Sequence, residues 1–379
     1  MAVERLVSPT LSDSLDPPDS ERHGSGGAGA GSLRPRTLSE YVGQPDLVER
    51  LAITIQAVRA RNEPMEHVLL HGPPGLGKTT LAHVIAEEMG SNTPGMRRLG
   101  DESRGSLQSS HPVQVHITSG PALTRPTDLV RVLCSMAERD VLFIDEIHRL
   151  PIAVEEFIYP AMEDFVIDIR VESGMHAQTI QKKLAPFTLI GATTRAGLVS
   201  SPLRSRFGIT HSLRYYTPAE LLIILRRSAS LLSVPAADAA LDLIAARSRG
   251  TPRIANRLLR RVRDFAQVKG DGTLTPRMVN DALALEGIDH LGLDELDRAY
   301  LRVIAKTYAG GPVGLEAVAA TLNHDSGTLE DVVEPYLLQI GFLARTRRGR
   351  ALTADGARHI GMPNAAPTSA DLFDKEPLA

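Results

Sequence analysis

Two short motifs hold the residue types that bind and split a nucleotide, and the first is GPPGLGKT at residues 72–79. It matches the phosphate-loop pattern G-x-x-x-x-G-K-[ST] between an apolar run and a helical pattern. Glycines such as Gly75 let backbone N–H groups turn toward a phosphate, and the start of the helix adds a favourable dipole. Lys78 is predicted to bind the β- and γ-phosphates of ATP. Thr79 is predicted to offer its hydroxyl to Mg²⁺, with Thr80 one residue further into the helix.

The second motif is VLFIDEIH at residues 141–148. Four apolar residues predict a central strand, and Asp145 and Glu146 follow at its carboxyl end, where parallel sheets bind their ligands. Asp145 is predicted to hold Mg²⁺ through water, and Glu146 to orient and polarise the attacking water. The pair also suits the first turn of the next helix, and this capping role remains an alternative. Together the two motifs predict hydrolysis of a nucleoside triphosphate.

A pair of arginines follows in SPLRSRFG, residues 201–208, after the predicted strand TLIGATT. The polar end of that strand, Thr193 and Thr194, is expected beside Asp145 and Glu146. In phosphoryl transfer the protein mainly positions the reactants and neutralises their charge. An arginine supplied by a neighbouring subunit can raise the rate about 10³- to 10⁵-fold. Such a role requires a ring of subunits. Two solvated arginines in a turn remain the alternative.

The elements that position these motifs alternate between strands and helices up to Thr217, which predicts a mainly parallel α/β sheet covered on both faces. Helical patterns with Thr-Pro starts follow, and the last block adds a short hairpin around Gly349. The predicted parts are a disordered extension (1–32), an α/β ATPase domain (33–216) with a polar insertion (91–112), a helical lid (217–287), a winged-helix head (288–363) and a flexible tail (364–379).

Composition excludes several classes of protein. The formal net charge of -3 in 379 residues argues against a polybasic coat or an acidic tail protein, so basic surface must be local. The single Cys134 argues for a reducing compartment and is expected to be a buried, inert thiol. No apolar run approaches about 18 residues, and no export signal is present, so a cytoplasmic protein without a membrane span is expected.

These motifs, with LRPRTLSEYVGQ, YPAMEDF, GTPRIANRLLRRVRDFA and IGFLARTRRGR, closely resemble the RuvB family of the AAA+ superfamily, from about Leu33 to about Pro363. The resemblance implies an ATP-driven motor that moves Holliday junctions. Positions matching the family's adenine-side and nucleotide-pocket contacts are Leu33, Arg34, Glu163, Asp164, Phe165 and Tyr216. Thr194 matches the first sensor, Arg206 the trans-acting finger, and Arg253 the second sensor.

The terminal hairpin places four arginines in six residues, which suggests local contact with phosphates and not readout of bases. Family correspondence implies that Arg345 and Arg350 contact DNA. It also implies a homo-hexamer on duplex DNA at Holliday junctions, with RuvA and the resolvase RuvC as partners. The region 172–189, which docks RuvA in the family, has diverged here. An initiator-like ATP switch and a clamp-loader-like assembly factor remain alternatives, since both are built on similar ATPase cores.

Overall fold

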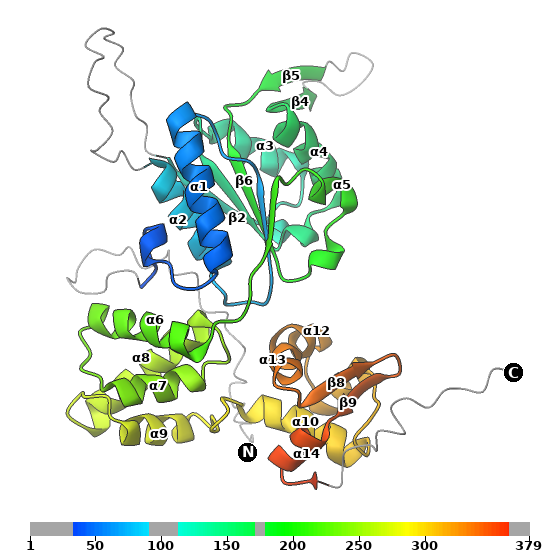
Figure 1. The fold of residues 1–379 in the computed structure, drawn as a ribbon. Coiled ribbons are helices and arrows are strands. Elements are labelled where there is room, and N and C mark those ends of the chain that lie inside the picture. The colour runs from blue at the N-terminus through cyan, green and yellow to red at the C-terminus, as the bar shows by residue number, and fades with distance from the viewer. Residues whose placement is uncertain (1–32, 91–112, 171–178, 364–379) are drawn as a thin grey trace, which may run out of the picture. The chain divides into compact units, whose positions relative to one another are not determined.

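The computed structural model describes residues 33–90, 113–170 and 179–363 (Figure 1). The expected extension 1–32, insertion 91–112 and tail 364–379 lie outside these ranges, as do residues 172–178 of the predicted docking region. Within the described ranges, no helix combines the length and the apolar character that a membrane crossing requires.

The first part of the chain forms a five-stranded parallel sheet, as the alternating pattern predicts. Its strands in spatial order are β2 (Val115–Ser119), β3 (Val141–Asp145), β6 (Thr188–Thr193), β1 (Val68–His71) and β7 (Ile209–Ser212). Because β6 pairs with both β1 and β3, the carboxyl ends of these three strands meet at one edge of the sheet. Two further strands, β4 (Val166–Arg170) and β5 (Thr179–Lys183), form a separate antiparallel pair.

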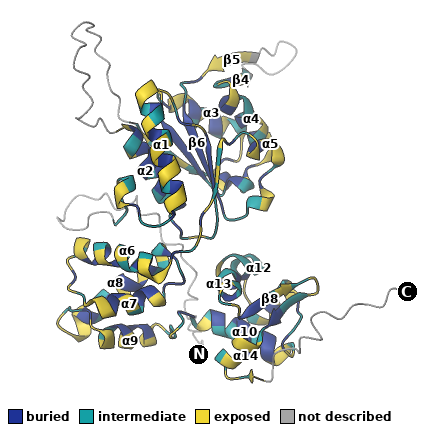
Figure 2. Cartoon of the chain, viewed as in Figure 1, coloured by how far each residue is buried: buried dark blue, intermediate teal, exposed yellow. Residues whose placement is uncertain are grey.

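Alternate strand residues point to opposite faces of the sheet, and each face therefore has its own core. On one face, Val68 and Leu70 pack with helices α1 (Pro45–Arg61) and α2 (Lys78–Gly90). On the other face, Leu69 packs with α3 (Pro126–Ser135) and α4 (Ile152–Glu163). Figure 2 shows the central strand β6 buried and the outer surface of α1 exposed. Every residue of β6 is buried, so this strand is held firmly from both faces.

A helical segment follows the sheet, as predicted, and consists of α6 (Pro218–Leu231), α7 (Asp238–Ala246), α8 (Pro252–Lys269) and α9 (Pro276–Leu285). Three of these helices begin at a Thr-Pro pair, where proline suits the first helical position. At α6 the Thr217 hydroxyl accepts from the Glu220 N–H, and Glu220 accepts from the Thr217 N–H, so the two residues form a capping box.

The last part of the chain has a core of its own, which includes Tyr300, Leu337 and Leu352. Its elements are α10 (Glu295–Thr307), α11 (Leu315–Leu322), α12 (Ser326–Thr328), a π-helical turn (Leu329–Val333), α13 (Glu334–Gln339), β8 (Leu343–Thr346), β9 (Gly349–Leu352) and α14 (Ala354–His359). The predicted hairpin is confirmed by the pairing of β8 with β9. Gly349 is required there because its φ is 137° and a Cβ would lie 2.3 Å from the Val313 carbonyl oxygen.

One expectation about the core is wrong, because Cys134 is exposed and not buried. The buried residues of α3 are Leu129 and Leu133, and Cys134 is rotated about 100° from Leu133 around the helix axis. Its Sγ lies 3.2 Å from Nζ of Lys182. The apolar periodicity of the segment predicts the helix, but it does not determine the side of the helix on which a single small residue lies.

Candidate functional site

The phosphate loop joins β1 to α2 at the carboxyl edge of the sheet. Gly75 has a φ of 80°, in the left-handed region that favours glycine, and a Cβ there would lie 3.2 Å from Cβ of Arg253. Thr79 and Thr80 follow directly in the first turn of α2, as predicted. The backbone N–H groups of this turn have no carbonyl partner within the helix and are available to an anion.

Lys78 is the first residue of α2, and its side chain is buried. Its Nζ donates to the carbonyl oxygens of Gly72 at 2.9 Å and Pro73 at 3.0 Å, so the amine lies inside the loop. Burial lowers the pKa of Lys78, while the charges of Asp145 and Glu146 oppose that shift. The structure therefore brings the lysine of the first motif within electrostatic reach of both carboxylates of the second.

Asp145 ends β3, and the next residue, Glu146, adopts a left-handed conformation with a φ of 48°. For a residue other than glycine this conformation costs about 1–3 kcal/mol and is typical of functional sites. Asp145 Oδ1 accepts from the Glu146 N–H at 3.0 Å. Glu146 Oε2 accepts from the Thr194 hydroxyl at 3.2 Å, which confirms that the polar end of the next strand lies beside the acidic pair.

Arg253 and Tyr216 also lie at the phosphate loop. The N–H of Arg253, at the start of α8, is 3.4 Å from the carbonyl oxygen of Gly75. Tyr216 is buried, and its hydroxyl lies 3.2 Å from that of Tyr41 and 3.4 Å from the Leu76 carbonyl oxygen. Burial, together with Tyr41, raises the pKa of Tyr216 well above its usual range, so its phenol stays neutral.

Leu33 and Arg34 are held by the side chain of Arg227 in α6, which donates to both of their carbonyl oxygens at 3.3 Å. Burial lowers the pKa of His83 in α2, and the positive charge of Arg34 lowers it further. Arg34 therefore lies near α2, the helix that begins at Lys78. This position is consistent with the predicted contact on the adenine side of the nucleotide.

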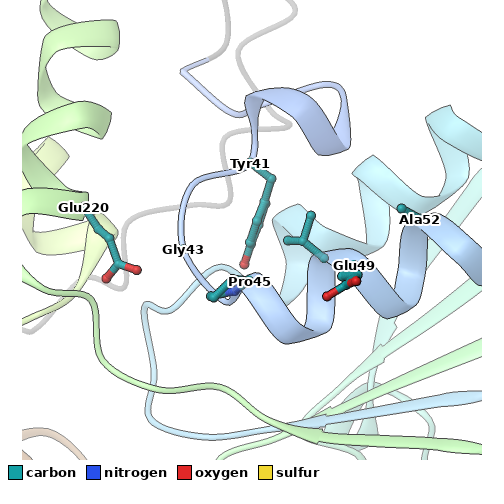
Figure 3. Close-up of a pocket in the computed structure, with 7 residues that line it drawn as sticks. Tyr41, Gly43, Pro45, Glu49, Ala52 and Glu220 are labelled. Carbon is teal, nitrogen blue, oxygen red and sulfur yellow. The ribbon is translucent and has the colours of Figure 1, made fainter.

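An open pocket of about 530 Å³ lies next to Tyr41 (Figure 3). It is lined by Tyr41, Gly43, Pro45, Val48, Glu49, Ala52 and Glu220. None of these described residues belongs to the phosphate loop or to the acidic motif. Two of them are carboxylates, which repel a phosphate, so the chemistry belongs to the carboxyl edge of the sheet and not to this pocket.

Arg206 lies elsewhere, against α4 of the same chain. Its Nη2 is 3.0 Å from Glu163 Oε1, its Nη1 donates to the Pro202 carbonyl oxygen at 2.6 Å, and its guanidinium lies 4.3 Å from the ring centre of Tyr159. The neighbouring Arg204 instead donates to the Val199 carbonyl oxygen within its own loop. Both arginines of SPLRSRFG thus bind carbonyl oxygens of their own segment, and Arg206 also contacts α4.

Glu163 is the last residue of α4, Asp164 and Phe165 follow it, and the three lie away from the phosphate loop of their own chain. Asp164 is the C-terminal cap of the helix, and the Phe165 ring packs on His67 at 6.4 Å and on Phe187 at 5.8 Å. His67 and Phe187 precede β1 and β6, so Phe165 lies at the amino edge of the sheet. The structure brings Glu163 together with Arg206, and it leaves the other predicted nucleotide contacts at the opposite edge.

Arg345 and Arg350 face each other across the hairpin, and both bind the carboxylate of Glu334, which is fully buried. Arg345 Nε donates to Oε2 at 2.9 Å, and Arg350 Nε donates to Oε1 at 2.8 Å. The Tyr300 hydroxyl donates to the same Oε1 at 2.5 Å. The two arginines therefore lie in the paired strands of the hairpin, one residue pair before its turn, and are partly neutralised by a buried acid.

Arg347 and Arg348 occupy the turn between β8 and β9, and both are exposed. Among the residues that the structure describes, neither is part of an ion pair with a carboxylate. The hairpin thus carries two classes of arginine, one bound to Glu334 within its paired strands and one in its turn without a described ion pair.

Sequence reasoning missed the groups that hold the predicted residues in place. His148 stands inside the second motif, and its only signal was that it lies two residues from Glu146. Glu334 and Tyr300 stand in ordinary helical patterns, and nothing in those patterns marks a buried acid 34 residues from the tyrosine that binds it. Side chains of this kind become visible only when the fold brings distant segments together.

Three successive parts of the chain match families of known proteins. The RuvB P-loop domain family matches residues 33–102 and 105–213, the RuvB AAA lid domain family matches 216–289, and the RuvB C-terminal winged helix domain family matches 290–361. The Holliday junction branch migration complex subunit RuvB of Kosmotoga olearia is 52% identical over 331 residues, which cover 87% of this chain and 90% of that protein.

Solved structures with a similar fold include the RuvB Holliday junction branch migration motor of Thermotoga maritima. It is 48% identical, has a TM-score of 0.73, and the match covers 87% of this chain and 98% of that one. A lysine-to-arginine mutant of the same Thermotoga protein gives a TM-score of 0.75 at 48% identity, with the same coverage of both chains. The parallel sheet with a helical lid and a winged helix is therefore confirmed.

Proposed function

The chain belongs to the RuvB family of Holliday junction branch-migration motors, and we propose that it works as a homo-hexameric ring on duplex DNA. It is an ATPase that drives branch migration in recombination and repair. An initiator-like switch and a clamp-loader-like factor are not supported, because all three parts of the chain match RuvB families and not only the ATPase core.

The observation that carries the ATPase function is the meeting of Lys78, Asp145, Glu146 and Thr194 at the carboxyl edge of one sheet. In our proposal Lys78 binds the β- and γ-phosphates. Glu146 orients the attacking water and accepts its proton. Thr194 fixes the Glu146 carboxylate and senses the γ-phosphate. Arg253 and Tyr216 bind the nucleotide from the lid side, and Leu33 and Arg34 bind it on the adenine side.

The residues at this edge fit Mg²⁺, which accompanies ATP. The Thr79 hydroxyl and the Asp145 carboxylate are hard oxygen ligands, the kind that Mg²⁺ prefers. No set of three metal-ligating His, Cys, Asp or Glu side chains exists among the described residues, as expected where phosphates and water complete the coordination. Bound Mg²⁺ would neutralise charge on the transferring phosphoryl group. Asp145 donates no proton and serves to hold the metal in place.

The position of Arg206 supports a role at a neighbour's nucleotide. Arg206 pairs with Glu163, and Phe165, two residues further along the chain, packs on His67 before β1, away from the phosphate loop of their own chain. In the ring that we propose, this surface faces the phosphate loop of the next subunit. Arg206 then supplies positive charge to the γ-phosphate of that subunit, and Glu163, Asp164 and Phe165 contribute to the far side of its nucleotide.

The DNA contact in our proposal is the terminal hairpin, with Arg345 and Arg350 on phosphates. RuvA recruits the ring to the four-way junction through the diverged 172–189 region, and RuvC resolves the junction afterwards. This assembly acts in the cytoplasm. The exposed hairpin arginines support backbone contact without base readout, because no aromatic side chain stands among them.

Replacing Glu146 by Gln tests the catalytic assignment. The variant should retain Mg-ATP binding and lose turnover by about 10²- to 10⁴-fold, the usual contribution of a general base. Migration of a synthetic four-way junction, measured with and without RuvA, should fall in parallel. Normal turnover by Glu146→Gln would overturn the assignment, and RuvA-independent migration would overturn the proposed recruitment.

A further inference from the structure

His148 lies in the 3₁₀ turn directly after Asp145 and Glu146, and its side chain is only 9% exposed. Its Nδ1 is 2.8 Å from the Thr193 hydroxyl and 3.2 Å from Glu146 Oε2. The role that we propose for Glu146 does not account for this contact. An imidazole buried against the carboxylate that handles water is therefore the strongest unassigned feature of the site.

The proton of His148 can be placed from its surroundings. Burial lowers the pKa of His148, and the charge of Glu146 opposes that shift only in part, so the ring is neutral near pH 7 and carries one proton. Both atoms that face Nδ1 are oxygens, and one of them belongs to a carboxylate, which can only accept. The proton therefore resides on Nδ1, and the imidazole donates it toward Glu146 and Thr193.

We infer that His148 is a positioning residue that holds the Glu146 carboxylate in the orientation needed to receive a proton from water. The inference rests on the proposed role of Glu146. His148 acts only through that carboxylate and does not touch the nucleotide. No covalent step is involved, since the imidazole keeps its proton on Nδ1 while Glu146 accepts one from water.

The geometry explains why two donors are useful. The Thr194 hydroxyl donates to Glu146 Oε2 at 3.2 Å, and His148 Nδ1 lies 3.2 Å from the same oxygen, where its proton is shared with the Thr193 hydroxyl. Among the described residues, no donor binds the other oxygen, Oε1, so it remains available to water. Two donors from different elements fix the plane of a carboxylate, whereas a single donor leaves it free to rotate.

The support for His148 is itself rigid. Thr193 belongs to β6, every residue of which is buried, and its hydroxyl also accepts from the Arg195 N–H at 3.0 Å. His148 is thereby held from the strand that also carries the sensor threonine Thr194. A shift of that strand would move both donors of Glu146 together.

Three substitutions of His148 test the inference, because they separate the two ring nitrogens. His148→Ala removes the donor, and His148→Gln places an amide near the Nε2 position. His148→Asn keeps an N–H near the Nδ1 position. We expect kcat for ATP to fall about tenfold to a hundredfold in the Ala and Gln variants, the cost of a misplaced catalytic group, and to recover largely in the Asn variant. Nucleotide affinity should not change in any of them.

Glu146→Gln serves as the reference in the same assay. If His148 acts through Glu146, adding His148→Ala to Glu146→Gln should cause no further loss in single-turnover hydrolysis. A further loss, or equal activity of the Asn and Gln variants, would overturn the positioning role, and so would unchanged or higher turnover of His148→Ala. Full activity of Glu146→Gln would instead refute the role of Glu146.

Thr193→Val provides a second route if His148→Ala does not fold. It removes the hydroxyl that holds Nδ1 and keeps both the imidazole and the strand-forming character of the residue. We expect a smaller fall in kcat with unchanged nucleotide affinity. Normal kcat in a folded Thr193→Val protein would count against the rigid support that the inference requires.

Discussion

Arg206 and Glu163 form an ion pair within one chain, with Nη2 3.0 Å from Oε1, although both match nucleotide contacts of the family. Tyr159 completes this cluster by lying under the guanidinium, and its hydroxyl donates to Glu155 at 2.6 Å. The ion pair with Glu163 fixes the Arg206 side chain, whose ordering would otherwise cost conformational entropy. A finger fixed in this way can meet a neighbour's phosphate with less loss of entropy on assembly.

Arg206→Ala should lower ATP turnover of the assembled protein by about 10³- to 10⁵-fold, since a trans-acting arginine contributes on that scale. Mixing Arg206→Ala subunits with Lys78→Ala subunits should restore part of the activity. An intact site forms wherever an Arg206→Ala subunit supplies the phosphate loop and a neighbouring Lys78→Ala subunit supplies the arginine. Turnover of the mixtures is the measurement, and no recovery in mixtures shown to co-assemble would contradict the trans role.

Gly120→Ala should impair hydrolysis from a position outside both motifs. A Cβ on Gly120 would lie 2.4 Å from the carbonyl oxygen of Glu146, so the backbone of the acidic turn has to shift. We expect kcat to fall by about tenfold to a hundredfold, because small displacements of catalytic groups are costly. Gly197→Ala is the matched control, since a Cβ there meets nothing within 4 Å. Equal kcat of the Gly120→Ala and Gly197→Ala variants would contradict the expected displacement of the acidic turn.

The sequence was sufficient for the fold because local patterns and tertiary structure agree in this chain. The loop at 72–79 stands between a strand and a helix, and the carboxylates at Asp145 and Glu146 follow an apolar run. Both features require that the two strands be parallel in one sheet, and they are, with β6 between them. The Thr-Pro starts of the lid helices are equally local, since proline and a capping hydroxyl mark a helix start without help from the rest of the fold.

The site could be predicted only in part, because electrostatic partners come from distant segments. The sequence identifies Arg345 and Arg350, but it does not show that buried Glu334 binds both. It likewise aligns Glu163 with nucleotide contacts, yet the strand order puts that residue beside Arg206 at the opposite edge of the sheet. Pairings of this kind depend on how elements pack, and no periodicity encodes them.

Glu334→Gln should make the winged-helix segment less stable at neutral pH. Burial raises the pKa of Glu334, but hydrogen bonds from Arg350, Tyr300 and Arg345 outweigh burial and hold it below the ordinary value of 4.5. The folded state therefore favours the carboxylate, and this stabilisation is fully present above pH 4.5 and is lost as the pH falls through the folded pKa. We expect a loss of about 1–3 kcal/mol at pH 7.

Calorimetry across the pH range checks this prediction on the full chain. The difference in melting temperature between wild type and Glu334→Gln should be constant above about pH 5 and should shrink at lower pH. Tyr300→Phe is a milder companion, since it removes one neutral donor and leaves both arginines bound to the acid. A difference that grows on acidification would mean that Glu334 is protonated in the folded protein.

The two classes of hairpin arginine should respond differently to substitution. Each phosphate contact contributes about -0.9 to the slope of log affinity against log salt on duplex DNA. Arg347→Ala with Arg348→Ala should therefore reduce the slope by roughly two units if each residue meets one phosphate. Stability should not change, because no carboxylate partner is described for either residue.

Replacing Arg345 and Arg350 by Ala should reduce the slope as well, but it also leaves buried Glu334 with Tyr300 as its remaining side-chain donor. Removing the partners of a buried charge costs about 3–5 kcal/mol, so this variant should lose stability. The triple variant with Glu334→Gln removes the unpaired charge and should recover part of that stability without restoring the slope. ATP turnover without DNA should persist in all three proteins, because the hairpin does not contribute to the phosphate loop. A salt slope that changes only with Arg347 and Arg348 would assign DNA binding to the turn of the hairpin and leave Arg345 and Arg350 with a structural role in its paired strands.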